Sequence, residues 1–193
     1  MAHDGKLDLD FRNVTLTALD LNPANKVPSK LAFVKLAPVQ GSLFAKTPHM
    51  DDISQQQIGD CWFLGTLVAI LKLEIGPDII ENMMIETTDQ NERVVIVRLY
   101  DSSLNRHYLR MQKSIVTSRL GNSEYHARVD PNTIGYWPTF LEKELTAFDK
   151  NGNLDVAGAN YERIDGSTPQ RAFQHLLGVP VTELPIVNPT AEF

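Results

Sequence analysis

The chain has 193 residues, of which 42% are hydrophobic and 22% charged. This is enough for one domain with a real core, and two lobes of full size are not expected. A net charge of −6 argues against a nucleic-acid-binding protein, which normally carries a basic face. The single cysteine excludes an internal disulfide and weakly favours a reducing compartment.

Two features of the sequence bear on location. The first 13 residues contain no apolar core of signal-peptide length, and acids stand where a signal would carry basic residues. The longest apolar run, residues 62–71, is about half as long as a membrane span. We therefore expect no transmembrane segment, and a protein that is cytoplasmic or exported without a classical signal peptide.

The first half of the chain changes character near residue 57. Residues 1–48 mix lysine, proline and short apolar bursts, which indicates an extended leader partly packed as short strands. Residues 61–73 are apolar on nearly every side, which predicts a helix buried at the centre of the domain. Gly76 and Pro77 end it, and Asp78 is a candidate cap for a second helix over residues 79–84.

The second half alternates between strand and helix patterns. Residues 93–100 and 107–112 are predicted strands, joined as a hairpin by the polar stretch 101–105. Apolar residues then recur at helical spacing from Trp137 to Phe148. The fold class predicted from the whole pattern is α+β, led by helices.

Two further expectations concern the predicted helices near the C-terminus. On the Trp137 helix, we expect Glu142 and Lys143 to form a solvated face. Ser167 or Thr168 can cap a final short helix that has Pro169 at its start and Gly178 past its end.

The most informative segment is Gln55-Gln-Gln-Ile-Gly-Asp-Cys61-Trp62. It places a thiol at the first turn of the apolar helix, where unpaired amides and the helix dipole favour the reactive thiolate. Gln55 can supply an amide N–H to the oxyanion of an acyl-transfer intermediate. The alternative is that Cys61 only fills space, because free cysteines are usually buried and inert.

This segment resembles the nucleophile motif of the calpain family of cysteine peptidases. Tyr136-Trp137-Pro-Thr-Phe-Leu-Glu-Lys is similar to the Trp-Pro helix of that family, and Tyr161-Glu162 and Gly166-Ser167-Thr168 follow in the family's order. The resemblance implies a papain-like, calpain-like protease core. Its helix-rich, nucleophile-bearing half would contain a buried central helix and a small antiparallel hairpin.

The resemblance also implies how the chain is divided. Residues 1–42 would be an N-terminal leader, residues 43–184 the first subdomain of the protease core, and residues 185–193 a tail leading to a second subdomain.

The implied function is cleavage of internal peptide bonds in protein substrates. Cys61 would attack the carbonyl, and Gln55 with the Cys61 backbone N–H would hold the oxyanion. Gly59 and Trp62 are the candidate substrate-binding residues, although Trp62 is expected mainly to pack behind the nucleophile. The family's histidine and asparagine belong to the second subdomain, in the same or another chain, so this chain alone is expected to be inactive or nearly so.

Histidines within the chain are weaker candidates for the base. His175 with Asn188 has the right order, but the resemblance assigns position 175 to a non-catalytic residue. His107 and His126 are expected to be structural or solvent-facing, and His3 and His49 precede the nucleophile, against the family order.

No cofactor is expected, and calcium is a secondary possibility. The resemblance places a calcium-binding acid at Asp52, but its partner position is Gly135, so the site would lack a carboxylate. Residues 149–155 start like an EF-hand loop, but the glycine is misplaced and position twelve is Asn160. A polar turn is the alternative for this loop.

Two alternatives to a peptidase remain open from the sequence. A calpain-like half-domain can be a non-catalytic module that binds or regulates a protein. The same cysteine chemistry can also transfer the acyl group to an amine. The peptidase interpretation is favoured because both Cys61 and Gln55 are present.

Overall fold

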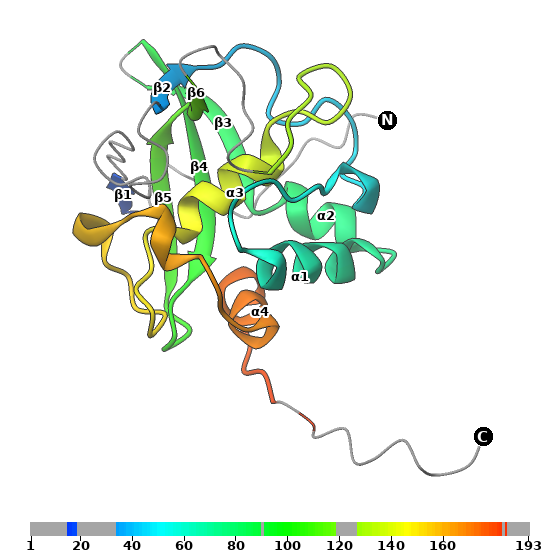
Figure 1. Ribbon diagram of the computed structural model, residues 1–193, viewed down its shortest axis with the longest axis vertical. Helices are drawn as coiled ribbons and strands as arrows, with labels where there is room; N and C mark the ends of the chain where they lie inside the picture. Colours follow the sequence, from blue (N-terminus) through cyan, green and yellow to red (C-terminus); the bar gives the residue numbers. More distant parts are fainter. Residues whose placement is uncertain (1–14, 19–33, 90, 119–126, 183, 185–193) are drawn as a thin grey trace.

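The computed structural model describes residues 15–18, 34–89, 91–118, 127–182 and 184. In this part of the chain, two strands are followed by two α-helices, four further strands and two more α-helices (Figure 1). The strands are β1 (Leu16–Ala18), β2 (Val34–Pro38), β3 (Met84–Asp89), β4 (Glu92–Tyr100), β5 (Arg106–Gln112) and β6 (Ser114–Ser118). The α-helices are α1 (Cys61–Leu71), α2 (Gly76–Glu81), α3 (Trp137–Leu145) and α4 (Pro169–Leu177). The predicted α+β class is confirmed.

A four-stranded sheet in the order β1-β5-β4-β3 forms the largest β element. The predicted β4–β5 hairpin is confirmed, with Val97 opposite Leu109. β3 pairs antiparallel with β4, and β1 pairs parallel with β5. The sheet is therefore larger than the small hairpin that the resemblance implied.

The predicted second helix is wrong in its bounds. α2 begins at Gly76, before Asp78, and the residue at its N-cap position is Ile75. Met84 already belongs to β3. Pro77 accounts for the earlier start, because a proline fits the first turn of a helix, where its missing N–H has no intrahelical acceptor.

A second, two-stranded sheet joins β2, from the N-terminal part of the chain, to β6. β2 pairs antiparallel with β6, with Leu36 opposite Val116. The Val39 amide extends this contact by donating to the Lys113 carbonyl at 3.1 Å. The described strands of the first 42 residues are thus both paired with strands from the middle of the chain.

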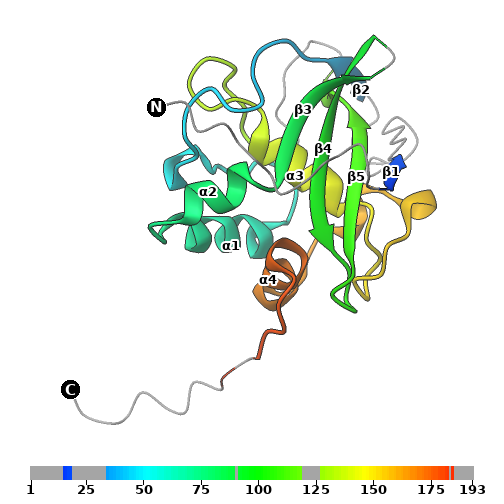
Figure 2. The ribbon, with the colours of Figure 1, turned by 180° about the vertical axis from the view of Figure 1, so that it is seen from behind.

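α3 is the buried helix of the fold. It packs against β4 and lies across one face of the sheet, as the two opposite views show (Figures 1 and 2). Every residue from Trp137 to Leu145 is buried. The expectation that Glu142 and Lys143 form a solvated face is therefore wrong, because this helix has no face in contact with solvent.

α1 lies beside α2 and α4 rather than at the centre. Its large side chains are buried, but Cys61, Gly65 and Ala69 are exposed. These positions are four residues apart and so share one face of the helix. The prediction that this apolar helix is buried at the centre of the domain is therefore corrected: one of its faces is exposed.

The C-terminal helix ends as its sequence predicts. α4 has Pro169 in its first turn, and Gly178 follows it at φ 64°, in the left-handed region. A Cβ on Gly178 would lie 2.5 Å from the Tyr100 ring, so only glycine fits this close approach. Thr168 occupies the N-cap position without a side-chain capping bond.

Candidate functional site

Cys61 is the first residue of α1 and its side chain is exposed. Its neighbours on both sides are buried: Asp60 is 1% exposed and Trp62 is 6% exposed. The interpretation that Cys61 only fills space in the core is therefore wrong. The only cysteine of the chain therefore lies at the surface, as the first residue of α1. The next three residues of this helix are buried in the core.

The amides at this helix end are oriented as in any α-helix start. The first helical hydrogen bonds come from the amides of Phe63 and Leu64, which both donate to the Asp60 carbonyl at 2.8 and 3.1 Å. The amides of Cys61 and Trp62 precede these bonds, at positions where a helix has no internal acceptor. They can donate to a negatively charged oxygen near the thiol.

Gln55 lies on the loop that leads into α1 and is exposed. Its side-chain amide nitrogen donates to the carbonyl of Ile58 at 2.6 Å, which fixes the loop conformation. An amide nitrogen carries two hydrogens, and this bond uses one of them. The other hydrogen can be offered to a substrate oxygen.

The loop of residues 164–166 packs against the segment that leads into and begins α1. The indole nitrogen of Trp62 donates to the Ile164 carbonyl at 2.9 Å, and the Gly166 amide donates to the Gly59 carbonyl at 3.0 Å. A Cβ on Gly59 would lie 2.1 Å from a carboxylate oxygen of Asp165. Gly59 thus permits a close approach of this loop, and Trp62 is a packing residue in the described structure.

Asp60, which precedes Cys61 in the sequence, and Glu142 of α3 are two buried acids. Burial raises the pKa of Asp60 from 3.8 to about 7, and repulsion from Asp165 adds to the rise while a backbone hydrogen bond opposes it. Burial also raises the pKa of Glu142 well above 4.5, and the charge of Asp60 raises it further. Both acids are therefore held partly or wholly in the neutral form near neutral pH.

The described histidines do not supply a base at Cys61. His175 is 2% exposed, its Nδ1 contacts the Tyr100 carbonyl at 2.6 Å, and its ring packs on Phe148. Burial lowers its pKa, as for a histidine kept neutral in the core. His107 contacts the Asp101 carboxylate at 2.9 Å, and His49 caps a short 3-10 helix. His3, His126 and Asn188 lie outside the described residues.

The residues around Asp52 do not fit a calcium site. The Asp52 carboxylate is buried and is already neutralised by the Lys46 ammonium at 2.8 Å, while the His49 amide donates to its second oxygen at 2.8 Å. Gly135 has a φ of 89°, and a Cβ there would lie 2.3 Å from the Leu43 carbonyl oxygen. No side chain at position 135 can therefore supply the second carboxylate that a hard cation would need.

The EF-hand-like stretch is built as a polar turn. One oxygen of Asp149 accepts the amides of Asn151 and Asn153 at 2.8 and 2.9 Å. Asp101 holds the Asn105 amide in the same way at 2.9 Å, in a loop without any likeness to a calcium site. Among the described residues, no group of three or more His, Cys, Asp or Glu side chains is arranged to hold a metal ion.

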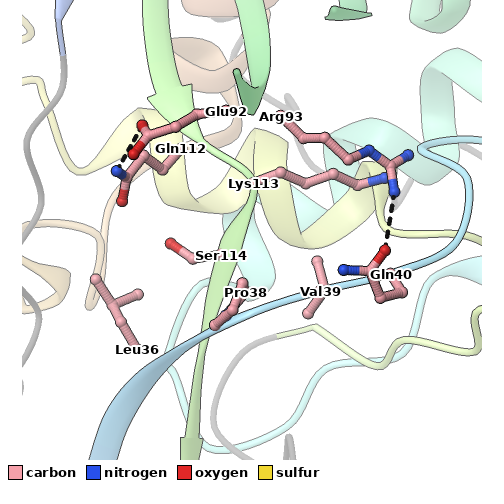
Figure 3. Close-up of a pocket in the computed structure, with 9 residues that line it drawn as sticks. All are labelled: Leu36, Pro38, Val39, Gln40, Glu92, Arg93, Gln112, Lys113 and Ser114. Carbon is pink, nitrogen blue, oxygen red and sulfur yellow. Dashed lines mark hydrogen bonds between the residues drawn. The ribbon is translucent and has the colours of Figure 1, made fainter. Parts of the chain in front are cut away.

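Two surface hollows of equal volume are present, one beside β3 and one beside β2, β4, β5 and β6. Figure 3 shows the second, of about 340 Å³, where Arg93 and Lys113 point into the same region. Both cations are paired with Glu86, and Lys113 is bonded to it at 2.6 Å. The residues lining this hollow are Leu36, Pro38, Val39, Gln40, Glu92, Arg93, Gln112, Lys113 and Ser114, so neither Cys61 nor Gln55 belongs to it.

No protein-family model matches the chain, and no curated protein matches it in sequence. Within the described residues, no helix has both the length and the apolar character needed to cross a membrane.

Sequence reasoning missed Glu142 and the 164–166 loop as parts of this site. Asp60 stood beside the cysteine in the quoted motif, but its burial is not visible from its neighbours. Glu142 carried no signal, because its burial depends on the packing of α3.

Proposed function

We propose that the chain is the nucleophile-bearing part of a calpain-like cysteine endopeptidase, in which Cys61 attacks the carbonyl of a peptide bond. The observation that carries the proposal is the exposed thiol at the start of α1, with Gln55 on the loop before it. Exposure and a helix N-terminus are the conditions under which a thiolate is accessible and electrostatically favoured.

The proposed chemistry begins with attack of the Cys61 thiolate on the substrate carbonyl. The negative charge that forms on the oxygen is stabilised by the Cys61 backbone N–H and by the free hydrogen of the Gln55 amide. Collapse of this intermediate gives an acyl-enzyme and releases the amine half of the substrate. The substrate class is protein, and the residues described here hold only one wall of the site.

A base must come from elsewhere to complete the cycle. Amine release needs a proton donor, and hydrolysis of the acyl-enzyme needs a group that activates water. The described histidines are used in the core, in a turn and in a cap. We propose that a second subdomain, in the same or another chain, supplies the histidine and its asparagine partner.

The acylation half-reaction can be tested on residues 1–193 with an activated substrate. A p-nitrophenyl acyl ester has a good leaving group, so we expect a burst of one nitrophenol per thiol and little turnover. Cys61→Ala should abolish the burst. Gln55→Ala should slow it by about 100-fold through the loss of one oxyanion donor.

Gln56→Ala is the matched control, because Gln56 is the next residue and is also exposed. It should leave the burst unchanged. Equal burst rates in the Gln55→Ala and Gln56→Ala variants would refute the oxyanion role of Gln55. Absence of a burst from the unmodified chain would favour the alternative, a non-catalytic half-domain that binds a protein.

A further inference from the structure

A buried histidine bonds α4 to β4. The helix packs against both β4 and α1, near the end of the β4–β5 hairpin (Figures 1 and 2). His175 lies in its last turn and is 2% exposed. Its Nδ1 contacts the Tyr100 carbonyl oxygen at 2.6 Å. Because a carbonyl oxygen can only accept, Nδ1 carries a hydrogen and donates it, which leaves Nε2 as the nitrogen that can bind a second proton.

Close contacts enclose the His175 ring. The Phe148 ring packs on it, with 4.5 Å between the ring centroids. Gly152 lies beside Nε2, since a Cβ on this glycine would be 3.7 Å from that nitrogen. A proton on Nε2 would therefore place a positive charge in a site from which solvent is largely excluded, and burial of a charge without a partner is strongly unfavourable.

The acids in the loops around His175 are engaged with other groups. The Asp101 carboxylate, between β4 and β5, contacts Nε2 of His107 at 2.9 Å. Asp149, in the loop that carries Gly152, accepts two backbone amides of its own loop at 2.8 and 2.9 Å. In the described part of the chain, neither acid forms an ion pair with His175.

The nearby cation would repel a charge on the ring. Arg171, one turn earlier on α4, donates to the Lys150 carbonyl, and α1 contains no charged residue. Burial lowers the pKa of His175, and the charge of Arg171 lowers it further. The bond to Tyr100 and the charge of Asp101 oppose this shift. While α4 is docked, His175 is therefore held as the neutral ring.

We propose that His175 is an acid-sensitive latch, which keeps α4 on β4 while its ring is neutral and favours detachment of the helix when the ring binds a proton. In the detached helix, the ring meets water and titrates like an exposed histidine, near pH 6.5. The detached state thus takes up a proton that the docked state excludes, so a falling pH shifts the equilibrium towards detachment.

Detachment of α4 has a structural consequence for its neighbours. The helix buries Ala172 and Leu176, which are 0% and 1% exposed, and it packs against α1. Its loss would uncover these apolar side chains and a flank of the helix that begins at Cys61. The latch concerns the docking of α4 and does not depend on whether Cys61 is a nucleophile.

Hydrogen exchange of backbone amides tests the latch in the full chain. A useful reporter is the Gly178 amide, which donates to the Gln174 carbonyl at 2.9 Å and is lost from that bond when the last turn of α4 opens. After correction for intrinsic exchange, protection of the α4 amides should fall about three- to fourfold between about pH 8 and about pH 6.

The amides of β4 distinguish a local opening from unfolding of the whole protein. Amides in core strands exchange mainly through global unfolding. The buried Glu144 makes global unfolding less favourable as the pH falls, because burial raises its pKa well above 4.5. We therefore expect protection of β4 to be maintained or to increase over the range in which α4 loses protection.

His175→Gln separates the latch from other titrating groups. Its side-chain amide can still donate to the Tyr100 carbonyl but binds no proton in this pH range. The variant should abolish the loss of α4 protection at lower pH. His49→Asn is the control, because His49 is exposed and asparagine can also cap a helix, and it should lose α4 protection as the unmodified chain does.

Three results would overturn the proposal. The first is equal α4 protection at both pH values in the unmodified chain, which needs no variant and stands even if His175→Gln fails to fold. The second is an equal loss of protection in α4 and β4, because acid would then loosen the whole domain. The third is a His175→Gln protein whose α4 amides still lose protection, since the titrating group would then lie elsewhere.

Discussion

α1 and α3 differ in sequence, and the environment of each departs from what its sequence indicates. α1 contains no charged residue, yet Cys61, Gly65 and Ala69 face solvent. α3 contains Glu142, Lys143 and Glu144, yet all nine of its residues are buried. Average hydropathy describes the composition of a helix, but its place among the other elements decides which side chains meet water.

The difference has a chemical consequence in each helix. The other exposed residues of α1, Gly65 and Ala69, have small side chains or none, so the Cys61 thiol is accessible from solvent. The buried charges of α3 must be neutralised or bonded inside the core. Lys143 donates to the Ser114 carbonyl at 2.8 Å, while both oxygens of Glu144 lack a partner among the described residues.

The largest expected effect is a test of the buried side of α1. Phe63 is completely buried, so Phe63→Ala removes a large side chain and leaves a cavity. We expect the free energy of unfolding to fall by about 4 kcal/mol. Ala69→Ser on the exposed face should cost no more than about 0.5 kcal/mol. Urea denaturation measures both, and equal losses would show that α1 is not divided into a buried and an exposed face.

The elements that could be predicted from the sequence are those whose characteristic residues lie close together along the chain. α4 was predicted from Pro169 and Gly178, and the β4–β5 hairpin from two strand patterns joined by a short polar stretch. β6 was missed because its partner, β2, lies far away in the sequence. The candidate site shows the same dependence on nearby residues. The start of α1 at Cys61 was predicted from its motif, whereas the burial of Glu142 could not be predicted because it depends on how other elements enclose α3.

Glu144 provides the next test, this time of the buried charge in α3. Burial raises its pKa well above 4.5, and nearby Lys143 only partly opposes this rise. The folded protein therefore holds a proton that the unfolded chain releases above pH 4.5, so stability falls as the pH rises from that point. Glu144→Leu should remove this loss, so the free energy of unfolding should no longer fall with pH in this way and should exceed that of the unmodified chain by more at about pH 8 than at about pH 5.

The comparison variant is Glu74→Leu, at an exposed position, which should change stability by no more than about 0.5 kcal/mol. Urea denaturation at several pH values between about pH 5 and about pH 8 measures the slope that distinguishes the two variants. A loss of stability in Glu144→Leu at every pH would mean that Glu144 is charged and paired with Lys143, because breaking a buried ion pair is strongly destabilising.

The smallest expected effect concerns the exposed face of α1 and has the opposite sign to Phe63→Ala. An ideal Cβ on Gly65 would have no neighbouring atom within 4 Å, so alanine fits there without strain. Because glycine inside a helix is less favourable than alanine, Gly65→Ala should raise the free energy of unfolding by about 1 kcal/mol. The alkylation rate of Cys61, one helical turn away, should stay unchanged, since iodoacetamide is small. A destabilised Gly65→Ala protein would mean that this face is covered in solution, and the open approach to the thiol on which the proposed function depends would be lost with it.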